Sequence, residues 1–328
     1  DWFVIYMKQY GITVDYKAYN AALDKYLESA GKLKATDYER IGLVKACLGY
    51  DRNFIIDTIN NKTGTGGIMS TIYGLMLAVS NDYVSPDRIT EIADSLVSLQ
   101  MADGGWNLSG AYSDADVTAM ALQALSAVRS YGYEDNIQKG VGRLAALQKD
   151  DAGYASYGVN NSESTAQVLM ALCALNIDYR TDTRFIKNGH TVLDALMGYR
   201  TSKGAFSHTK DGKSNALATT QALGALVCAD NYEKHGTFIY RYGNIQSRPV
   251  QKETQPDVKP SPEQPAKTEP HHSCDGSIAA TEHTQEVTGV YEVTGNETTD
   301  EDITKPAHDE TTSGGTQPEE STTDNRTE

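Results

Sequence analysis

Residues 93–106 read ADSLVSLQMADGGW, an amphipathic segment followed by a turn of small residues and then an aromatic residue. The pattern returns as GRLAALQKDDAGY at residues 142–154 and as LDALMGYRTSKGAF at residues 193–206. One structural unit is therefore used at least three times in this chain.

A more apolar segment that begins with threonine follows each unit, and an earlier copy precedes the first. The four segments read TIYGLMLAVS, TAMALQALSAV, TAQVLMALCAL and TTQALGALVCA. Their leading threonines lie 47, 47 and 54 residues apart, at Thr71, Thr118, Thr165 and Thr219. This spacing is typical of an array of helical hairpins.

Both kinds of segment favour helix, because they are rich in Ala, Leu, Met and Gln and hold few β-branched residues. The segments before the turns mix charged and apolar positions, whereas the threonine-led segments are apolar nearly all round. We therefore expect an outer and an inner layer. An open array would leave one face of the inner helices in water, so we expect closure into an α/α toroid. With residues 1–11 and a weaker copy at residues 38–48, the all-α toroid has about six inner and five outer helices.

We expect the toroid to span residues 1–245 and a disordered acidic Thr/Pro-rich spacer to span residues 246–328. From Gln251 onward the chain has no Leu, Phe, Trp or Met, so it cannot bury enough apolar surface to offset the ordering of its backbone. This tail has 5 Lys or Arg against 18 Asp or Glu, and it carries −13 of the net charge of −15. A near-neutral body and an acidic tail argue against nucleic acid as a partner.

The sequence gives no sign of a cofactor, a metal or a membrane span. The four cysteines form no C-x-x-C pair and have no histidine at metal-ligand spacing, and no phosphate loop, G-x-S-x-G or H-E-x-x-H is present. No stretch reaches the roughly 18 apolar residues of a membrane span. We therefore expect no cofactor, no metal and no direct insertion into a membrane.

The block QMADGGW, at residues 100–106, fits the Q-x-x-x-G-x-W pattern of the terpenoid-cyclase and protein-prenyltransferase repeat. With SDADVTAMALQAL and NSESTAQVLMALCAL, it closely resembles the prenyltransferase/squalene-oxidase repeat domains of exported bacterial surface proteins, over about residues 1–242. The resemblance implies an α/α toroid and an extracellular or cell-surface location. It leaves the function open, because proteins of this fold do many different things.

Squalene-hopene cyclases protonate an alkene with D-x-D-D-T-A, which DADVTA at residues 114–119 matches in part. The resemblance implies that Asp116 is the acid and that Asp114 lies beside it. Val117 replaces the third carboxylate, which weakens the catalytic case because such an acid depends on its neighbours. Two alternatives are helix capping by the two aspartates and a polar contribution to a ligand site at the mouth of the ring.

The chemistry of two other proteins with this fold is not expected here. The Asp-x-Cys and His that hold zinc in protein prenyltransferases are missing around Glu163 and Ala218. GTGGIM, at residues 64–69, lacks the Cys and Gln of complement-type thioester domains.

Candidate ligand contacts gather where the inner helices are expected to begin. The aromatic residues of the turns, Trp106, Tyr154 and Phe206, are expected to be plugs between repeats. Tyr112 and Tyr157 precede the inner helices more directly and are candidates for facing a ligand. The other candidates are polar residues at this rim or on the inner helices: Asn161, Glu163, Gln167, Gln221 and His208. For His208, a solvated position in a turn is the alternative.

The leading hypothesis is a non-catalytic binding module of an exported bacterial surface protein, whose ligand is an apolar or cobalamin-like small molecule or a protein. The rival hypothesis is a terpenoid cyclase or isomerase that uses Asp116 as general acid with Asp114 beside it. A third possibility is a purely structural ring that mediates protein contacts.

Overall fold

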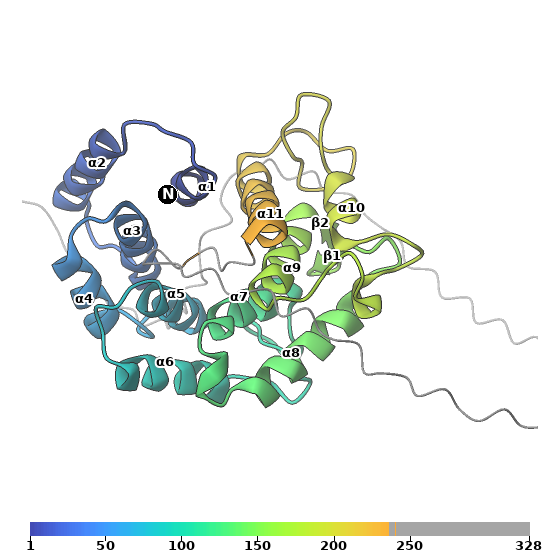
Figure 1. Ribbon diagram of the computed structural model, residues 1–328, viewed down its shortest axis with the longest axis horizontal. Helices are drawn as coiled ribbons and strands as arrows, with labels where there is room; N and C mark the ends of the chain where they lie inside the picture. The colour runs from blue at the N-terminus through green and yellow to red at the C-terminus, as the bar shows by residue number, and fades with distance from the viewer. Residues whose placement is uncertain (236–239, 241–328) are drawn as a thin grey trace, which may run out of the picture. The chain divides into compact units, whose positions relative to one another are not determined.

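The computed structural model describes residues 1–235 and Tyr240, all within the first of two units of the chain, Asp1–Pro256. The predicted spacer at residues 246–328 lies outside the described residues. The described part is built from α-helices and one short hairpin (Figure 1), so the predicted all-α class is confirmed. None of its helices is long and apolar enough to cross a membrane.

The odd-numbered helices form the inner layer. Each contacts the next odd-numbered helix, and α11 contacts α1, so that the contacts close a cycle (Figure 1). This order of contacts supports the predicted toroid, which stays a prediction. The inner helices are α1 (Trp2–Gln9), α3 (Ala35–Leu48), α5 (Ile68–Val79), α7 (Ala115–Ser126), α9 (Ser162–Ala174) and α11 (Ala216–His235).

The even-numbered helices pack on the outside. Helix α4 contacts α3 and α5, α2 contacts α3, and α6, α8 and α10 contact α5, α7 and α9, respectively. The outer helices are α2 (Tyr16–Ser29), α4 (Arg52–Asn61), α6 (Pro86–Ser98), α8 (Glu134–Leu147) and α10 (Val192–Met197). In α6 only Ile92, Ala93 and Leu96 are buried, whereas α9 is buried from Ser162 to Cys173. The predicted difference in burial between the two layers is therefore confirmed.

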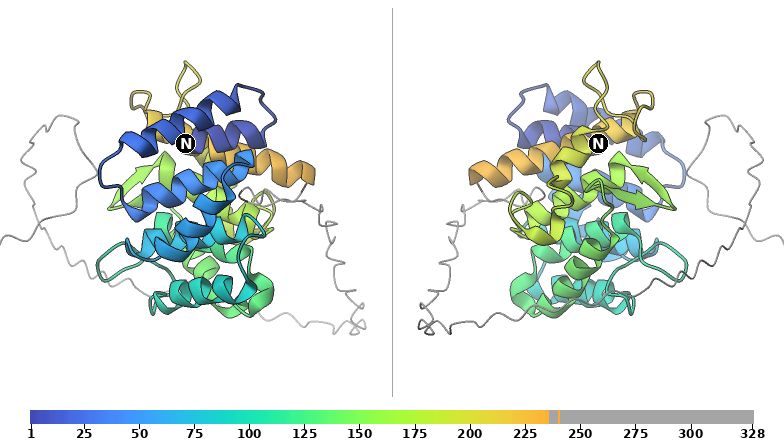
Figure 2. Two further views of the ribbon diagram at one scale, coloured as in Figure 1. Left: turned by 90° about the vertical axis from the view of Figure 1, so that its left-hand side faces the viewer. Right: turned by 90° about the vertical axis from the view of Figure 1, so that its right-hand side faces the viewer.

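The small elements lie between the helices. Strands β1 (Tyr154–Ser156) and β2 (Val159–Asn161) pair antiparallel just before α9. This hairpin projects from one edge of the helices in both side views (Figure 2). Two 3-10 turns, η1 (Arg129–Tyr131) and η2 (Thr183–Phe185), follow α7 and precede α10.

The repeated threonines connect three inner helices, α7, α9 and α11, to the aromatic residue of the preceding turn. The backbone N–H of Trp106 donates to the Thr118 hydroxyl (2.9 Å), which donates back to the Trp106 carbonyl (3.2 Å). The N–H groups of two further turn aromatics, Tyr154 and Phe206, donate to Thr165 and Thr219 in the same way. All three aromatic side chains are buried, as expected of plugs. That each one packs between two repeats stays a prediction.

A glycine lets the first and last inner helices meet. A Cβ atom on Gly224 of α11 would lie 2.5 Å from Cζ of Tyr6 in α1. Any side chain at residue 224 would therefore push the Tyr6 ring away. This close approach is where the cycle of inner helices closes.

Candidate functional site

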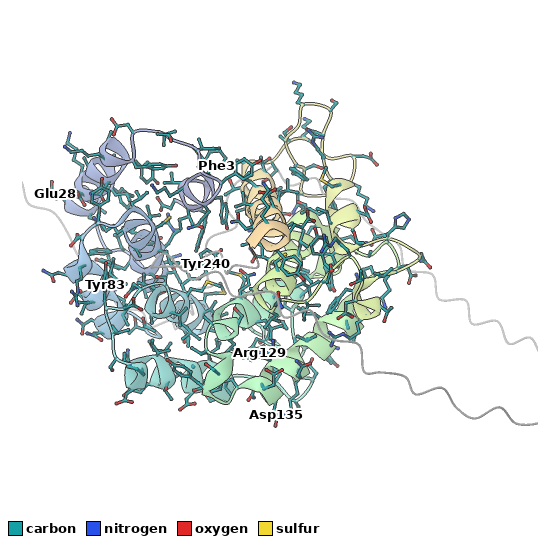
Figure 3. All side chains as sticks on the ribbon, viewed as in Figure 1. Phe3, Glu28, Tyr83, Arg129, Asp135 and Tyr240 are labelled. Carbon is teal, nitrogen blue, oxygen red and sulfur yellow. The ribbon has the colours of Figure 1, made fainter. Side chains whose placement is uncertain are left out.

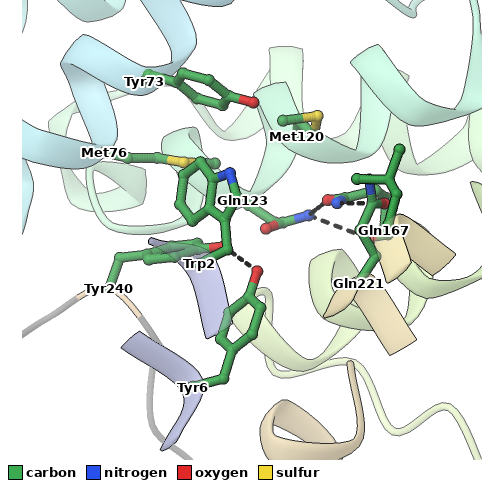
Figure 4. A pocket seen from close by; sticks show the side chains of 10 residues that line it. Trp2, Tyr6, Tyr73, Met76, Met120, Gln123, Gln167, Gln221 and Tyr240 are labelled. Carbon is green, nitrogen blue, oxygen red and sulfur yellow. Dashed lines mark hydrogen bonds between the residues drawn. The ribbon is translucent and has the colours of Figure 1, made fainter. Parts of the chain in front are cut away.

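A cavity of about 150 Å³ lies between the inner helices. Figure 3 places Tyr240 between the inner helices, whereas Glu28 and Asp135 lie on the outer edge, and Figure 4 shows the cavity from close by. Five of the six inner helices contribute to its wall. The lining residues are Trp2, Tyr6, Tyr73, Met76, Met120, Gln123, Gln167, Leu217, Gln221 and Tyr240.

One side of the cavity is a row of three glutamines. Gln123 Nε2 donates to Gln167 Oε1 (2.8 Å), and Gln167 Nε2 donates to Gln221 Oε1 (3.0 Å) (Figure 4). Gln123 Nε2 also donates to the Gln167 backbone carbonyl (3.1 Å). Because that carbonyl can only accept, it fixes which end of the Gln123 amide faces Gln167. Oε1 of Gln123 is left buried without a donor among the described residues.

The opposite side of the cavity is aromatic. Trp2 packs edge-on against Tyr73, with ring centroids 5.3 Å apart, and against Tyr240, at 5.9 Å. The Tyr6 and Tyr240 hydroxyls lie 3.4 Å apart (Figure 4). Burial raises the pKa of Tyr73 to about 12. Burial raises the pKa of Tyr6 as well, so Tyr6 and Tyr73 stay neutral near pH 7. This side offers the cavity ring faces and hydroxyls.

The repeat explains which residues reach the cavity. Two positions after the leading threonine stand Tyr73, Met120, Gln167 and Gln221, and all four line the cavity. Three residues further on stand Met76 and Gln123, which line it too. Positions three apart share one face of a helix. The wall is therefore one repeated face of the inner helices.

The same helix faces continue to a carboxylate cluster at the N-terminal ends of α7 and α9. Asp116 lies four residues before Met120, and Glu163 lies four residues before Gln167, so each carboxylate lies one turn from a lining residue. The equivalent residue of α11 is Leu217, which itself lines the cavity. Asp116 and Glu163 do not themselves line the cavity. They lie one turn beyond lining residues, at the end that we call the mouth of the cavity.

The two predicted catalytic aspartates have different surroundings. Asp114 is the N-cap of α7, with Oδ1 accepting from the N–H groups of Asp116 (2.9 Å) and Val117 (3.3 Å). Its Oδ2 accepts from the Ser156 hydroxyl (2.6 Å). In contrast, Oδ1 of Asp116 is buried without a donor in the described part of the chain. Asp114 is thus held by capping, and Asp116 is the carboxyl that remains available.

Burial, together with the charges of Asp114 and Glu163, raises the pKa of Asp116 to about 7, while Ser164 and His208 act in the opposite direction. An acid that is about half-ionised at neutral pH can exchange a proton or bind a cation.

The structure brings three of the other predicted residues together and leaves two outside. Asn161 is the N-cap of α9 and accepts from the Ser164 N–H (2.7 Å). Glu163 is buried, and its Oε2 lies 2.9 Å from His208 Nδ1. His208 is half-exposed, in the turn before α11. Tyr112 and Tyr157 are 80% and 84% exposed and do not line the cavity.

Sequence reasoning found Gln167 and Gln221 but missed most of the wall. The repeat could have identified Tyr73, Met120 and Gln123, because they stand at the positions of Gln167 and Gln221 or one turn later. Trp2 and Tyr6 carry no such signal, since α1 lacks the leading threonine.

The cluster at the mouth is not a metal site by its geometry. Within residues 1–235 and Tyr240, no three or more His, Cys, Asp or Glu side chains are grouped so that they could hold a metal ion. Comparison with known proteins adds no identification: no family model matches this chain, and no curated protein matches it either.

Proposed function

We propose that this chain is a non-catalytic binding module that takes an apolar group of a small molecule into its central cavity. The observation that carries the proposal is the buried Oε1 of Gln123 in the wall of an otherwise largely apolar cavity, an acceptor to which none of the described residues donates. Burying such a group unpaired costs about 1–3 kcal/mol, and a ligand that donates a hydrogen bond recovers this.

The volume limits what can enter. A cavity of about 150 Å³ equals about five water molecules at the roughly 30 Å³ that each takes in the liquid, and an engineered apolar cavity of this size accepts benzene. The group that enters is therefore about one ring in size. A cobalamin-like ligand would have to bind outside this cavity.

Benzyl alcohol is a suitable first probe, because it combines one ring with one hydroxyl donor. We expect it to bind the full chain with a Kd of roughly 0.1–1 mM, as suits a ligand of so few atoms. It should also raise the melting temperature, since it binds only the folded form. Titration calorimetry and thermal melts measure the two effects.

Variants place the binding in the cavity. Gln123→Met keeps the side-chain volume but removes the acceptor, so the affinity for benzyl alcohol should fall about tenfold. The matched control is Gln138→Met, on the exposed face of α8, which should bind as the wild type does. Absence of any saturable binding to the wild type would refute the proposal, and so would equal affinities of the two variants.

A second candidate is an acid-catalysed cyclase or isomerase of a small isoprenoid. The raised pKa of Asp116 and its place at the mouth of the cavity favour it. Asp116 would protonate the alkene, and the resulting cation would lose a proton as the product forms. The purified chain incubated with a ten-carbon isoprenoid alcohol should then yield cyclised product, detected by gas chromatography, and Asp116→Asn should not. No product from the wild type would exclude this candidate for that substrate size.

The resemblance to exported bacterial surface proteins and the acidic Thr- and Pro-rich sequence after residue 245 support a place for this module at the cell surface. The location at the cell surface is part of the proposed function.

A further inference from the structure

The buried polar atoms without a partner in the described part of the chain include two acceptors on α7, Gln123 Oε1 and Asp116 Oδ1, and the hydroxyl of Ser164 on α9. Gln123 Oε1 lies in the wall, and Asp116 lies seven residues, or about two helical turns, before it in α7, at the mouth. Neither Gln123 Oε1 nor Asp116 Oδ1 has a donor among residues that the structure describes. A ligand that complements this arrangement must bring N–H or O–H groups to it. A ligand with only acceptors would leave both atoms unpaired.

The charge at the mouth is negative. Asp114, Asp116 and Glu163 interact closely enough to shift the pKa of Asp116. His208, which contacts Glu163, is a neighbour of these carboxylates that carries a positive charge when it is protonated. The nearby Lys210 is paired with Asp151. The cluster therefore attracts a cation and repels an anion.

Arg143 does not neutralise the cluster either. It pairs with Asp103 at 3.3 Å and donates to the Ser113 hydroxyl at 2.7 Å. Both contacts hold the Arg143 guanidinium against the segment between α6 and α7. The carboxylates at the mouth thus keep their charge available.

The wall of the cavity suits the same ligand. Trp2, Tyr6, Tyr73 and Tyr240 present aromatic rings, which pack well against another ring. The two methionines provide polarisable apolar surface that adapts to the shape of a ring or a short chain. An apolar body therefore finds complementary surroundings here, as a cationic head does at the mouth.

Resting on the proposed function, we propose that the ligand is an organic ammonium. Its ring-sized apolar group occupies the cavity, and its ammonium group binds Asp116 and Glu163 at the mouth. The carboxylates then favour a cationic ligand, and the cavity limits the size of its apolar group.

Benzylamine, benzyl alcohol and benzoate test the inference, because the three share one ring and differ in charge. Titration calorimetry of the full chain at about pH 8 should give benzylamine about tenfold tighter than benzyl alcohol, since charge-assisted hydrogen bonds are roughly twice as strong as neutral ones. Benzoate should bind more weakly than benzyl alcohol. Equal affinities for the amine and the alcohol would overturn the ammonium inference and leave the proposed function standing.

Variants assign the preference to the mouth. Asp116→Asn and Glu163→Gln should each reduce the preference for benzylamine several-fold without changing the affinity for benzyl alcohol. The matched control Asp135→Asn, an exposed acid in the first turn of α8, should keep the full preference. A preference that survives both mouth variants would refute the role of these carboxylates. Failure of all three probes to bind the wild type would instead refute the proposed function.

The preference should also depend on pH. With a pKa of about 7, Asp116 is mostly protonated at about pH 6 and mostly ionised at about pH 8. The affinity for benzylamine should rise by up to about tenfold across this range, because only the ionised carboxylate attracts the ammonium. The Asp116→Asn variant should lose most of this rise, while benzyl alcohol should bind equally at both pH values. A rise that persists in Asp116→Asn would contradict the assignment to this carboxyl.

Discussion

Replacing Asp116 by Asn is expected to stabilise the folded protein above neutral pH. Asp116 has a buried, unpaired Oδ1 and two neighbouring carboxylates, and its pKa is raised to about 7. Asn has almost the same shape and carries no charge at any pH. The variant therefore removes a buried charge that the wild type must accommodate whenever this carboxyl ionises.

The sign and the size follow from the two pKa values. In the unfolded chain Asp116 titrates near 3.8, and in the folded protein near 7, so the folded state binds the proton more tightly. The stability that this preference adds is fully present below about pH 3.8 and is lost as the pH rises through 7. At about 1.4 kcal/mol for each pKa unit, the loss is roughly 4 kcal/mol. The stability of Asp116→Asn relative to wild type should therefore increase by up to about 4 kcal/mol between pH 4 and pH 8.

Urea unfolding at several pH values from about 4 to about 8 measures this difference. Glu39, whose pKa burial raises to about 8, titrates in both proteins, so its contribution cancels in the comparison. Asp135→Asn, on the surface of α8, should show no such trend. A difference between Asp116→Asn and wild type that stays constant within about 0.5 kcal/mol over this range would refute a raised pKa at Asp116.

Two further substitutions test the contacts that hold the inner helices. Thr118→Val keeps the shape but leaves the buried Trp106 N–H without its acceptor, so urea unfolding should show a free energy of unfolding lower by about 1–3 kcal/mol. Thr118→Ser keeps the hydroxyl and should lose less stability. An equal loss in both variants would contradict this role of Thr118. Gly224→Ala should lower the free energy of unfolding by about 1–3 kcal/mol, because the new Cβ would lie 2.5 Å from Tyr6. It should also weaken the binding of benzyl alcohol, since it displaces Tyr6 from the cavity wall. Unchanged stability and binding would show that α1 and α11 do not meet so closely.

The sequence predicted the helical layers because one pattern is repeated. The leading threonines and the turn aromatics recur at matching positions, and the structure pairs them in three repeats, as with Thr118 and Trp106. The contrast between apolar and amphipathic segments predicted which layer each helix joins. Residues 1–11 gave a weaker signal, since one short apolar stretch does not reveal its neighbours.

The site was harder to predict than the fold. The aspartate motif indicated Asp116 as the acid but left helix capping open for both Asp114 and Asp116. Only the structure separates a cap with both oxygens bonded from a carboxyl that has one oxygen without a donor among the described residues. Tyr112 and Tyr157 precede the inner helices closely in sequence, yet the loops that carry them turn outward. Trp2 reaches the cavity only because α1 contacts both α3 and α11, and no local pattern encodes such a distant contact.

The closing of the helix cycle has a consequence for assembly. The cavity wall takes Trp2 and Tyr6 from the first helix and Gln221 from the last, and the Tyr6 and Tyr240 hydroxyls that meet are 234 residues apart in the chain. An open solenoid can form its binding surface one repeat at a time. Here the pocket stays incomplete until α11 has docked against α1, so ligand affinity reports whether the cycle of inner helices has closed.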